Sequence, residues 1–165
     1  MKPSRFWIVV ALGLTLVASP ALAAPVTPIR YEPEVAHCIS RAAQGSLWLE
    51  MTLWGLRDQE AGWVGADLVN NNGTHDLGVF QINSSWVPRL SQIVGRSEHR
   101  VSELLRYDPC FNAEVARWIF LSILHKFRDY WKAVGMYHSL TVWRQMHYVN
   151  GVKYHLKRRN WNVGF

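Results

Sequence analysis

Cysteine is scarce in this sequence, which has only Cys38 and Cys110 among its 165 residues. Ligands this sparse do not make a zinc site, and the histidines are not spaced as metal ligands, so we expect no metal and no cofactor. In an oxidising compartment two such cysteines are expected to form a disulfide, the alternative being two buried thiols. A loop of this length would be stabilised by roughly 4 kcal/mol when closed.

Long hydrophobic runs are also missing, except for one near the start of the chain. Residues 6–18 are apolar, they follow Lys2 and Arg5, and a small-x-small site, Ala21-Leu22-Ala23, comes soon after them. The run is short for a membrane span of about 20 residues, and the pattern is typical of a cleavable signal peptide. We expect residues 1–23 to be removed and the protein to be periplasmic or secreted, without a membrane span; an uncleaved anchor is the alternative.

No repeat, low-complexity tract or linker divides the remaining residues 24–165, which predicts one domain. Charge is uneven along them: residues 24–82 hold seven acidic and three basic side chains, and residues 83–165 hold five acidic and thirteen basic ones. A basic surface suits nucleic acid, an anionic membrane or an anionic polymer, and export disfavours nucleic acid. Nothing in the sequence predicts an oligomer, so we expect a monomer.

Helical patterns dominate and are interrupted by one stretch rich in asparagine and glycine, from Asn70 to Gly73. That stretch predicts turns, and the alternation after it predicts a short extended segment over Asp76–Asn83. Asp108-Pro109 is a strong helix start, and Ser46 is a candidate N-cap. We therefore expect a mainly α fold with helices over Glu34–Ala43, Leu47–Glu60, Trp86–Val94, Val101–Arg106, Asp108–Tyr130, Trp131–Tyr137 and Thr141–Lys157.

Glu60 ends the second predicted helix on its apolar side. At 100° per residue it lies close in azimuth to Leu49, Leu53 and Leu56, whereas Asp58 points the opposite way. A carboxyl on an apolar face loses hydration of its charged form, which raises its pKa and suits it to act as a general acid. The alternative is a glutamate that caps the helix or pairs with a neighbouring arginine.

Three segments resemble the lytic transglycosylase and lysozyme superfamily. Asp76–Asn83, with the sequence DLGVFQIN, is similar to that superfamily's Gly-Leu-Met-Gln-Ile stretch; Gln59-Glu60 precedes it at a fitting distance, and Tyr137 begins a partial match to Tyr-Asn-Ala-Gly. The matches follow the family's order, and the likeness extends to the small, specialised lytic transglycosylases of conjugation and of type III and type IV secretion systems. The resemblance implies a lysozyme-like fold with a short extended segment beside the catalytic cleft.

The resemblance also implies a reaction and its residues. Glu60 would protonate the β-1,4 bond between N-acetylmuramic acid and N-acetylglucosamine in peptidoglycan, then deprotonate the muramic 6-hydroxyl to close a 1,6-anhydro ring. Tyr137 would hydrogen-bond near Glu60. The implied partners are peptidoglycan strands and components of a secretion or conjugation apparatus. The implied substrate-binding residues are Gly78, Val79, Phe80, Gln81, Asn83 and Tyr137.

Several positions depart from the pattern and leave alternatives open. Ala61 stands where the family usually has serine, and His138 stands where it has asparagine. Asp76 precedes the Gly-x-x-Gln motif as in animal-type lysozymes, which predicts a hydrolase using Glu60 and Asp76 if the two carboxyls flank the bond. The alternative is that Asp76 caps the asparagine-rich loop. A third possibility is a non-catalytic, peptidoglycan-binding assembly protein.

Overall fold

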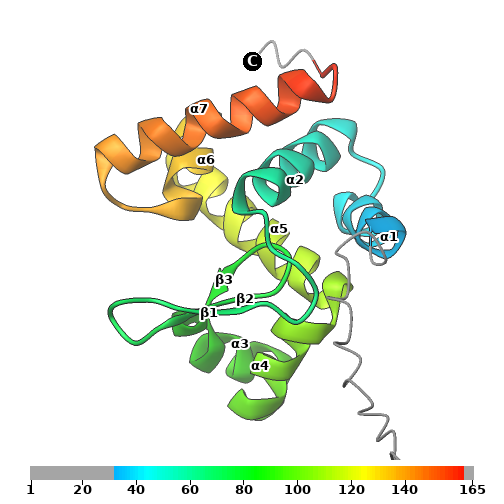
Figure 1. Cartoon of the computed structure of the whole chain (residues 1–165), viewed down its shortest axis with the longest axis vertical. Coiled ribbons are helices and arrows are strands. Elements are labelled where there is room, and N and C mark those ends of the chain that lie inside the picture. Colours follow the sequence, from blue (N-terminus) through cyan, green and yellow to red (C-terminus); the bar gives the residue numbers. More distant parts are fainter. Residues whose placement is uncertain (1–31, 162–165) are drawn as a thin grey trace, which may run out of the picture.

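The computed structural model describes residues 32–161, and the predicted signal peptide lies outside them. Within these residues the fold is mainly helical, as predicted, with a small antiparallel sheet (Figure 1). No helix among them is long and apolar enough to cross a membrane. The elements in chain order are α1 (Glu32–Ala43), α2 (Leu47–Glu60), β1 (Asp67–Val69), β2 (His75–Leu77), β3 (Ile82–Asn83), a 3-10 turn (Ser84–Trp86), α3 (Val87–Val94), α4 (Glu98–Tyr107), α5 (Pro109–Phe127), α6 (Tyr130–His138) and α7 (Val142–Arg158).

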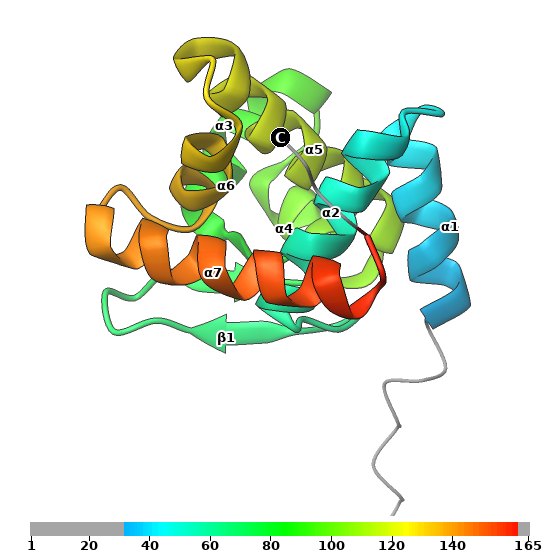
Figure 2. The ribbon, with the colours of Figure 1, turned by 90° about the horizontal axis from the view of Figure 1, so that it is seen from above.

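Helix α5 is the central element of the fold. It packs against α1, α2, α4 and α6, while α7 lies across α2 and α6 (Figure 2). Burying these apolar helix faces removes hydrocarbon from water, which is the main driving force for such packing. The largest fully buried side chains come from all parts of the described chain and include Ile39, Leu53, Leu56, Phe80, Phe120 and Leu156.

The ends of α5 show why its predicted length was wrong. The predicted cap is confirmed, because the Asp108 carboxylate accepts hydrogen bonds from the backbone N–H groups of Cys110 and Phe111 at 3.0 and 2.9 Å. The helix ends at Phe127 and not at Tyr130, because Arg128 adopts a left-handed conformation with φ of 56°. Asp129 then caps α6 by accepting from the Lys132 N–H, so α6 starts one residue earlier than expected.

Other helix boundaries differ less from the predictions. Helix α1 begins at Glu32 and α4 at Glu98, each ahead of its predicted start, and a 3-10 turn replaces the beginning of the helix predicted from Trp86. Ser46 occupies the N-cap position of α2, but its side chain makes no capping hydrogen bond.

The prediction of one extended segment over Asp76–Asn83 is wrong for its central residues. Strands β2 and β3 occupy its two ends, and residues 78–81 between them form a turn that reverses the chain. The reversal uses left-handed backbone at Gly78 and Gln81, with φ of 70° and 49°, which a strand cannot contain. Strand β1, which pairs with β2 to complete a sheet of order β1-β2-β3, was not predicted.

A buried asparagine in α5 fixes this turn. The Asn112 side chain donates to the carbonyls of Leu77 and Leu105 at 2.9 and 2.7 Å and accepts from the Phe80 N–H at 2.9 Å. Gly78 lies so close that a Cβ atom there would clash with the Leu105 carbonyl oxygen and the Asn112 side chain. The β2–β3 turn is therefore bound directly to the central helix.

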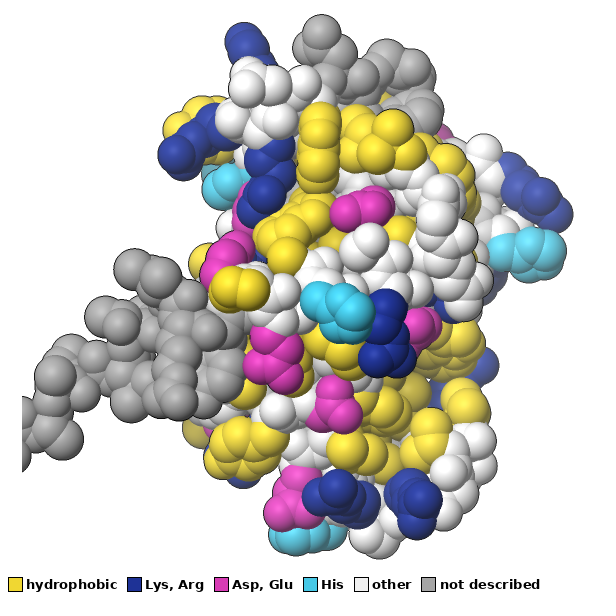
Figure 3. Space-filling view, turned by 90° about the vertical axis from the view of Figure 1, so that its right-hand side faces the viewer, with side chains coloured by type: hydrophobic (Ala, Val, Ile, Leu, Met, Phe, Trp, Pro, Cys, Tyr) yellow, Lys and Arg dark blue, Asp and Glu magenta, His cyan; other side chains and the backbone are white. Residues whose placement is uncertain are grey.

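Charged side chains on the α1 side of the molecule do not form a patch of one sign. Figure 3 shows basic and acidic groups interspersed among apolar ones over this face. The basic excess of the second half of the chain therefore does not give the coloured part of this face a uniform positive charge.

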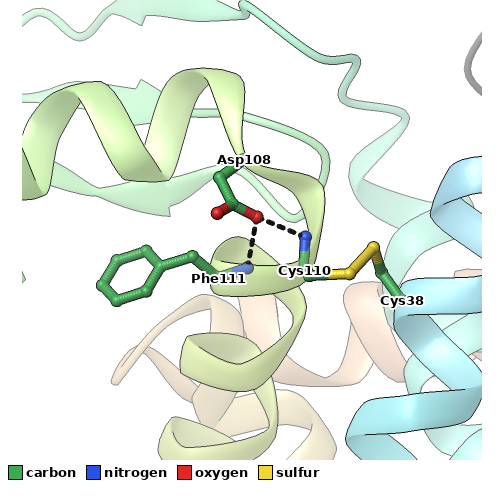
Figure 4. Close-up of a disulfide and its surroundings, with 4 residues drawn as sticks. All are labelled: Cys38, Asp108, Cys110 and Phe111. Carbon is green, nitrogen blue, oxygen red and sulfur yellow. Dashed lines mark hydrogen bonds between the residues drawn. A yellow bond between two sulfur atoms is a disulfide. The ribbon is translucent and has the colours of Figure 1, made fainter.

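The two cysteines form the predicted disulfide. Cys38 of α1 and Cys110 in the first turn of α5 are bonded, with their Cα atoms 4.5 Å apart (Figure 4). They are 72 residues apart in the sequence, so the bond ties the first described helix to the central one.

Candidate active site

A cleft of about 760 Å³ separates the sheet from α6 and the start of α7; we call it the main cleft. In Figure 1 the sheet and the β1–β2 loop lie below α6 and the start of α7. Its walls carry many hydrogen-bonding groups, which can pair with the polar groups of a bound ligand. Its lining residues include Glu60, Asn70, Asn71, Asn72, Asp76, Gln81, Asn83, Trp86, Tyr137, His138 and Arg144.

Glu60 reaches the main cleft from the last position of α2. The helix stops there because Ala61 takes a left-handed conformation with φ of 51°. Leu53 and Leu56, on the same side of α2, are fully buried, as the helical count predicts. Arg57 does not pair with Glu60, because its guanidinium contacts Glu32 and Asp58 instead.

The surroundings of Glu60 favour its protonated form. Burial raises the pKa of this carboxyl to about 7, and the nearby charge of Asp76 acts in the same direction. A hydrogen bond from the Tyr148 hydroxyl to Glu60 Oε1, 2.6 Å long, acts against this rise by stabilising the carboxylate. A carboxyl with a pKa near 7 can both donate and accept a proton at neutral pH.

Tyr148 is the functional candidate that sequence reasoning missed. Tyr137 was expected to hydrogen-bond near Glu60; it lines the main cleft, but its hydroxyl donates to the Phe80 carbonyl at 3.2 Å. Tyr148 is the residue that bonds Glu60, and the His138 ring stacks on it with centroids 4.7 Å apart. Only the docking of α7 on the end of α2 reveals this role.

The floor of the cleft is the β2–β3 turn. The substrate-binding residues predicted in this turn differ in whether their side chains reach the cleft. Gln81 and Asn83 line the cleft, whereas the side chains of Val79 and Phe80 are buried in the core. Those two residues therefore have only backbone groups to offer a ligand. Gly78 supports the floor, since its carbonyl accepts from Gln81 Nε2 at 2.8 Å.

Asp76 faces the same cleft from the middle of β2. It lies opposite Asn83 in β3 and accepts a 2.9 Å hydrogen bond from the Asn83 side chain. The interpretation of Asp76 as a cap of the asparagine-rich loop is wrong, because Asn70 and Asn72 close that loop through hydrogen bonds with Thr74. The structure thus brings two carboxyl groups, Glu60 and Asp76, to one cleft.

A second cavity, of about 310 Å³, opens on the α7 side of Glu60; we call it the side cavity. Glu60, His138 and Arg144 line both cavities, so the carboxyl stands where the two meet. The remaining lining residues are Gln59, Trp143, His147 and Tyr148. Within residues 32–161 no three histidine, cysteine or acidic side chains are grouped so as to hold a metal ion.

A largely buried acid at a helix end, opposite a short sheet across a polar cleft, is the arrangement that the sequence resemblance implies for a lysozyme-like domain. The chain belongs to the transglycosylase SLT domain family, whose model matches residues 37–154 and so includes both walls of the cleft. This confirms the resemblance seen in the sequence.

The chain is also similar, at moderate identity, to individual bacterial proteins. The chain is 31% identical to Protein IpgF of Shigella flexneri over 107 residues, which cover 64% of this chain and 67% of IpgF. It is 33% identical to the invasion protein IagB of Salmonella typhimurium over 90 residues, which cover 54% of this chain and 53% of IagB.

Proposed function

We propose that the protein is a peptidoglycan lytic transglycosylase that cleaves the β-1,4 bond between N-acetylmuramic acid and N-acetylglucosamine. The observation that carries the proposal is Glu60, a largely buried carboxyl with a pKa of about 7 at the meeting point of two cavities. Membership of the transglycosylase SLT domain family supports it.

In the proposed reaction one carboxyl acts twice. Glu60 first gives its proton to the glycosidic oxygen, which leaves with the bonding electrons while the substrate's own acetamido group stabilises the anomeric carbon. The Glu60 carboxylate then takes the proton of the muramic 6-hydroxyl as that oxygen bonds to the anomeric carbon. Tyr148 stabilises the carboxylate between the two steps through its 2.6 Å hydrogen bond, and no water is consumed.

The polar walls supply the proposed substrate contacts. Gln81 and Asn83 present amide groups from the floor, and Asn70 to Asn72 present more from the β1–β2 loop. Sugar hydroxyl and acetamido groups need such donors and acceptors when they leave water. Tyr137 forms part of the opposite wall.

A hydrolase of the lysozyme type is the second candidate, and Asp76 is the observation that favours it. Its carboxyl lines the same cleft as Glu60 and contributes to the raised pKa of Glu60. In that reaction Glu60 would protonate the glycosidic oxygen, and Asp76 would stabilise or bond the anomeric carbon as that oxygen leaves. Water would then give a proton to Glu60 and attack the anomeric carbon, releasing Asp76.

We further propose that the protein acts as a monomer in the periplasm or outside the cell, after cleavage of residues 1–23, and opens the wall locally for a secretion or conjugation apparatus. The sequence pattern of residues 1–23 supports export. The name of one relative, the invasion protein IagB, fits a role at such an apparatus.

The test is mass analysis of the fragments released from purified peptidoglycan. A transglycosylase releases anhydromuramic ends, which are one water lighter than the reducing ends left by a hydrolase. Glu60→Gln should lower the rate by at least about 100-fold, because a general acid contributes that much or more, while Asp76→Asn should leave anhydro products. If the parent protein releases reducing ends and Asp76→Asn does not, the hydrolase is established. If the parent protein releases no fragments, only a wall-binding role remains.

A further inference from the structure

Arg144, in the first turns of α7, lines both the main cleft and the side cavity. It shares this position with Glu60 and His138. A side chain at the junction of the two cavities is close to the place where the scissile bond must lie if Glu60 is to protonate it. What Arg144 binds therefore bears on which strands are cut.

The charge of Arg144 is not neutralised by any carboxylate in residues 32–161. Arg57, Arg106 and Arg159 each form an ion pair, but Arg144 forms none, and its guanidinium carbon lies 5.3 Å from the centre of the Trp143 ring. Trp143 is itself 63% exposed. The result is an unpaired cation beside an open aromatic face at the edge of the substrate cleft.

The positive charge of Arg144 acts on the neighbouring His138 ring. Burial lowers the pKa of His138, and the charges of Arg144 and His147 lower it further, with Asp76 acting in the opposite direction. On the sheet side of the cleft the charged lining group is the Asp76 carboxylate, and the other lining side chains there are uncharged. An anionic substituent on a bound strand is therefore favoured on the α7 side and opposed on the sheet side.

A guanidinium is matched in shape and charge to a carboxylate, which it binds through two parallel hydrogen bonds. Contact with Trp143 restricts the Arg144 side chain before a ligand arrives, which reduces the entropy lost on binding. Muramic residues are the carboxylate carriers of peptidoglycan: the lactyl group is a free acid in peptide-free strands, and the stem peptides carry acids where they are present.

We propose that Arg144, placed against Trp143, binds a carboxylate of the muramic residue next to the scissile bond. The inference rests on the proposed function, since it takes peptidoglycan as the substrate. It makes Arg144 a specificity-determining residue that distinguishes acidic muramic strands from neutralised ones.

Binding of a small ligand tests the inference without turnover. N-acetylmuramic acid and its lactyl methylamide are titrated into the protein and followed by NMR. The free acid should bind about five- to tenfold more tightly than the amide, as for one partly exposed charge-assisted pair, and Arg144→Gln should remove that difference. Equal binding of acid and amide to the parent protein would overturn the inference, whatever the catalytic activity.

Turnover of three strand preparations identifies the source of the carboxylate. They are peptide-bearing strands, peptide-free strands with free lactyl acids, and peptide-free strands converted to lactyl methylamides. Arg144→Gln should lower kcat/KM about five- to tenfold on one or both acidic preparations and leave the amide preparation unchanged, while Arg144→Lys should keep part of the preference. A loss confined to peptide-free acidic strands indicates the lactyl acid, and a loss confined to peptide-bearing strands indicates the peptide acids.

Lys157→Gln is the matched control, because it removes an exposed positive charge from the far end of the same helix. It should change no rate by more than about twofold, since exposed charges contribute little. A loss in Arg144→Gln that is equal on acidic and amidated strands, or equal to that of Lys157→Gln, would overturn the inference. Failure of the proposed function appears differently, as absence of turnover in the parent protein on every preparation.

Discussion

The raised pKa of Glu60 has a consequence for stability as well as for catalysis. The folded state holds the Glu60 proton up to a pH of about 7, whereas the unfolded chain releases it near the ordinary value of 4.5. Stability is therefore lost as pH rises through this window, by about 3 kcal/mol once it is passed. Glu60→Gln should be about that much more stable than the parent at pH 8 and nearly equal to it at pH 4.

Urea unfolding of both proteins at the two pH values measures this difference. Glu34→Gln is the control, because Glu34 is an exposed residue of α1 and its replacement should shift stability equally little at both pH values. A pH-independent effect of Glu60→Gln would show that the carboxyl is not held in its protonated form.

The Tyr148 hydroxyl tunes the same proton. Because its hydrogen bond lowers the pKa of Glu60, Tyr148→Phe should raise that pKa further, and the fall in activity on the alkaline side should move to higher pH. The pH profile of kcat/KM on purified peptidoglycan measures the shift.

Tyr137→Phe is the matched comparison for Tyr148→Phe. It removes a hydroxyl that bonds the Phe80 carbonyl and not Glu60, so the alkaline limb should stay in place. Equal shifts in the two variants would mean that the Tyr148 bond does not set the pKa.

The sequence allowed one of these residues to be predicted and not the other. Glu60 follows the apolar side of its own helix, so a count along α2 predicts its burial. Tyr148 shares a helix face with Val152 and Leu156, which are fully buried, and this spacing is that of an ordinary core tyrosine. Its partner lies 88 residues earlier in the chain, and only tertiary packing joins them.

At the scale of elements, the floor of the cleft depends on the link between α5 and the β2–β3 turn. Asn112→Ala would leave the Phe80 N–H and the carbonyls of Leu77 and Leu105 without their side-chain partner in the core. Each buried polar group left unpaired costs about 1–3 kcal/mol, so we expect a loss of at least about 3 kcal/mol in urea unfolding. Activity on peptidoglycan should fall as well.

The control for this prediction is Asn150→Ala, at an exposed position of α7, which should change stability by less than about 0.5 kcal/mol. A loss of similar size in both variants would contradict the role given to Asn112.

Helices were more predictable than the sheet because their signals are local. The Asp108-Pro109 start and the apolar stripe of α2 each depend on residues within a few turns. Strand β1 has three residues, two of them exposed, and owes its extended form to pairing with β2. The break inside Asp76–Asn83 arises from contact with Asn112, which no pattern within those eight residues can reveal.

At the scale of the whole molecule, the disulfide joins helices that are far apart in the chain. Replacing both Cys38 and Cys110 by serine should reduce the free energy of unfolding by about 4 kcal/mol, because the unfolded chain regains the freedom of a loop of this length. Urea unfolding measures the loss, and the parent protein treated with a strong reductant should reproduce it. An unchanged midpoint in either case would contradict the prediction.

Because the disulfide joins α1 to α5, the stability of the fold depends on whether the protein is in a reducing or an oxidising compartment. In a compartment rich in reducing thiols the cysteines stay unjoined, and the helix that supports the cleft floor lacks its covalent tie to α1. A newly made chain of this kind is a weaker, more easily degraded molecule until it meets an oxidant. Under the proposed function, the protein would thus reach its full stability only in the compartment where peptidoglycan is found.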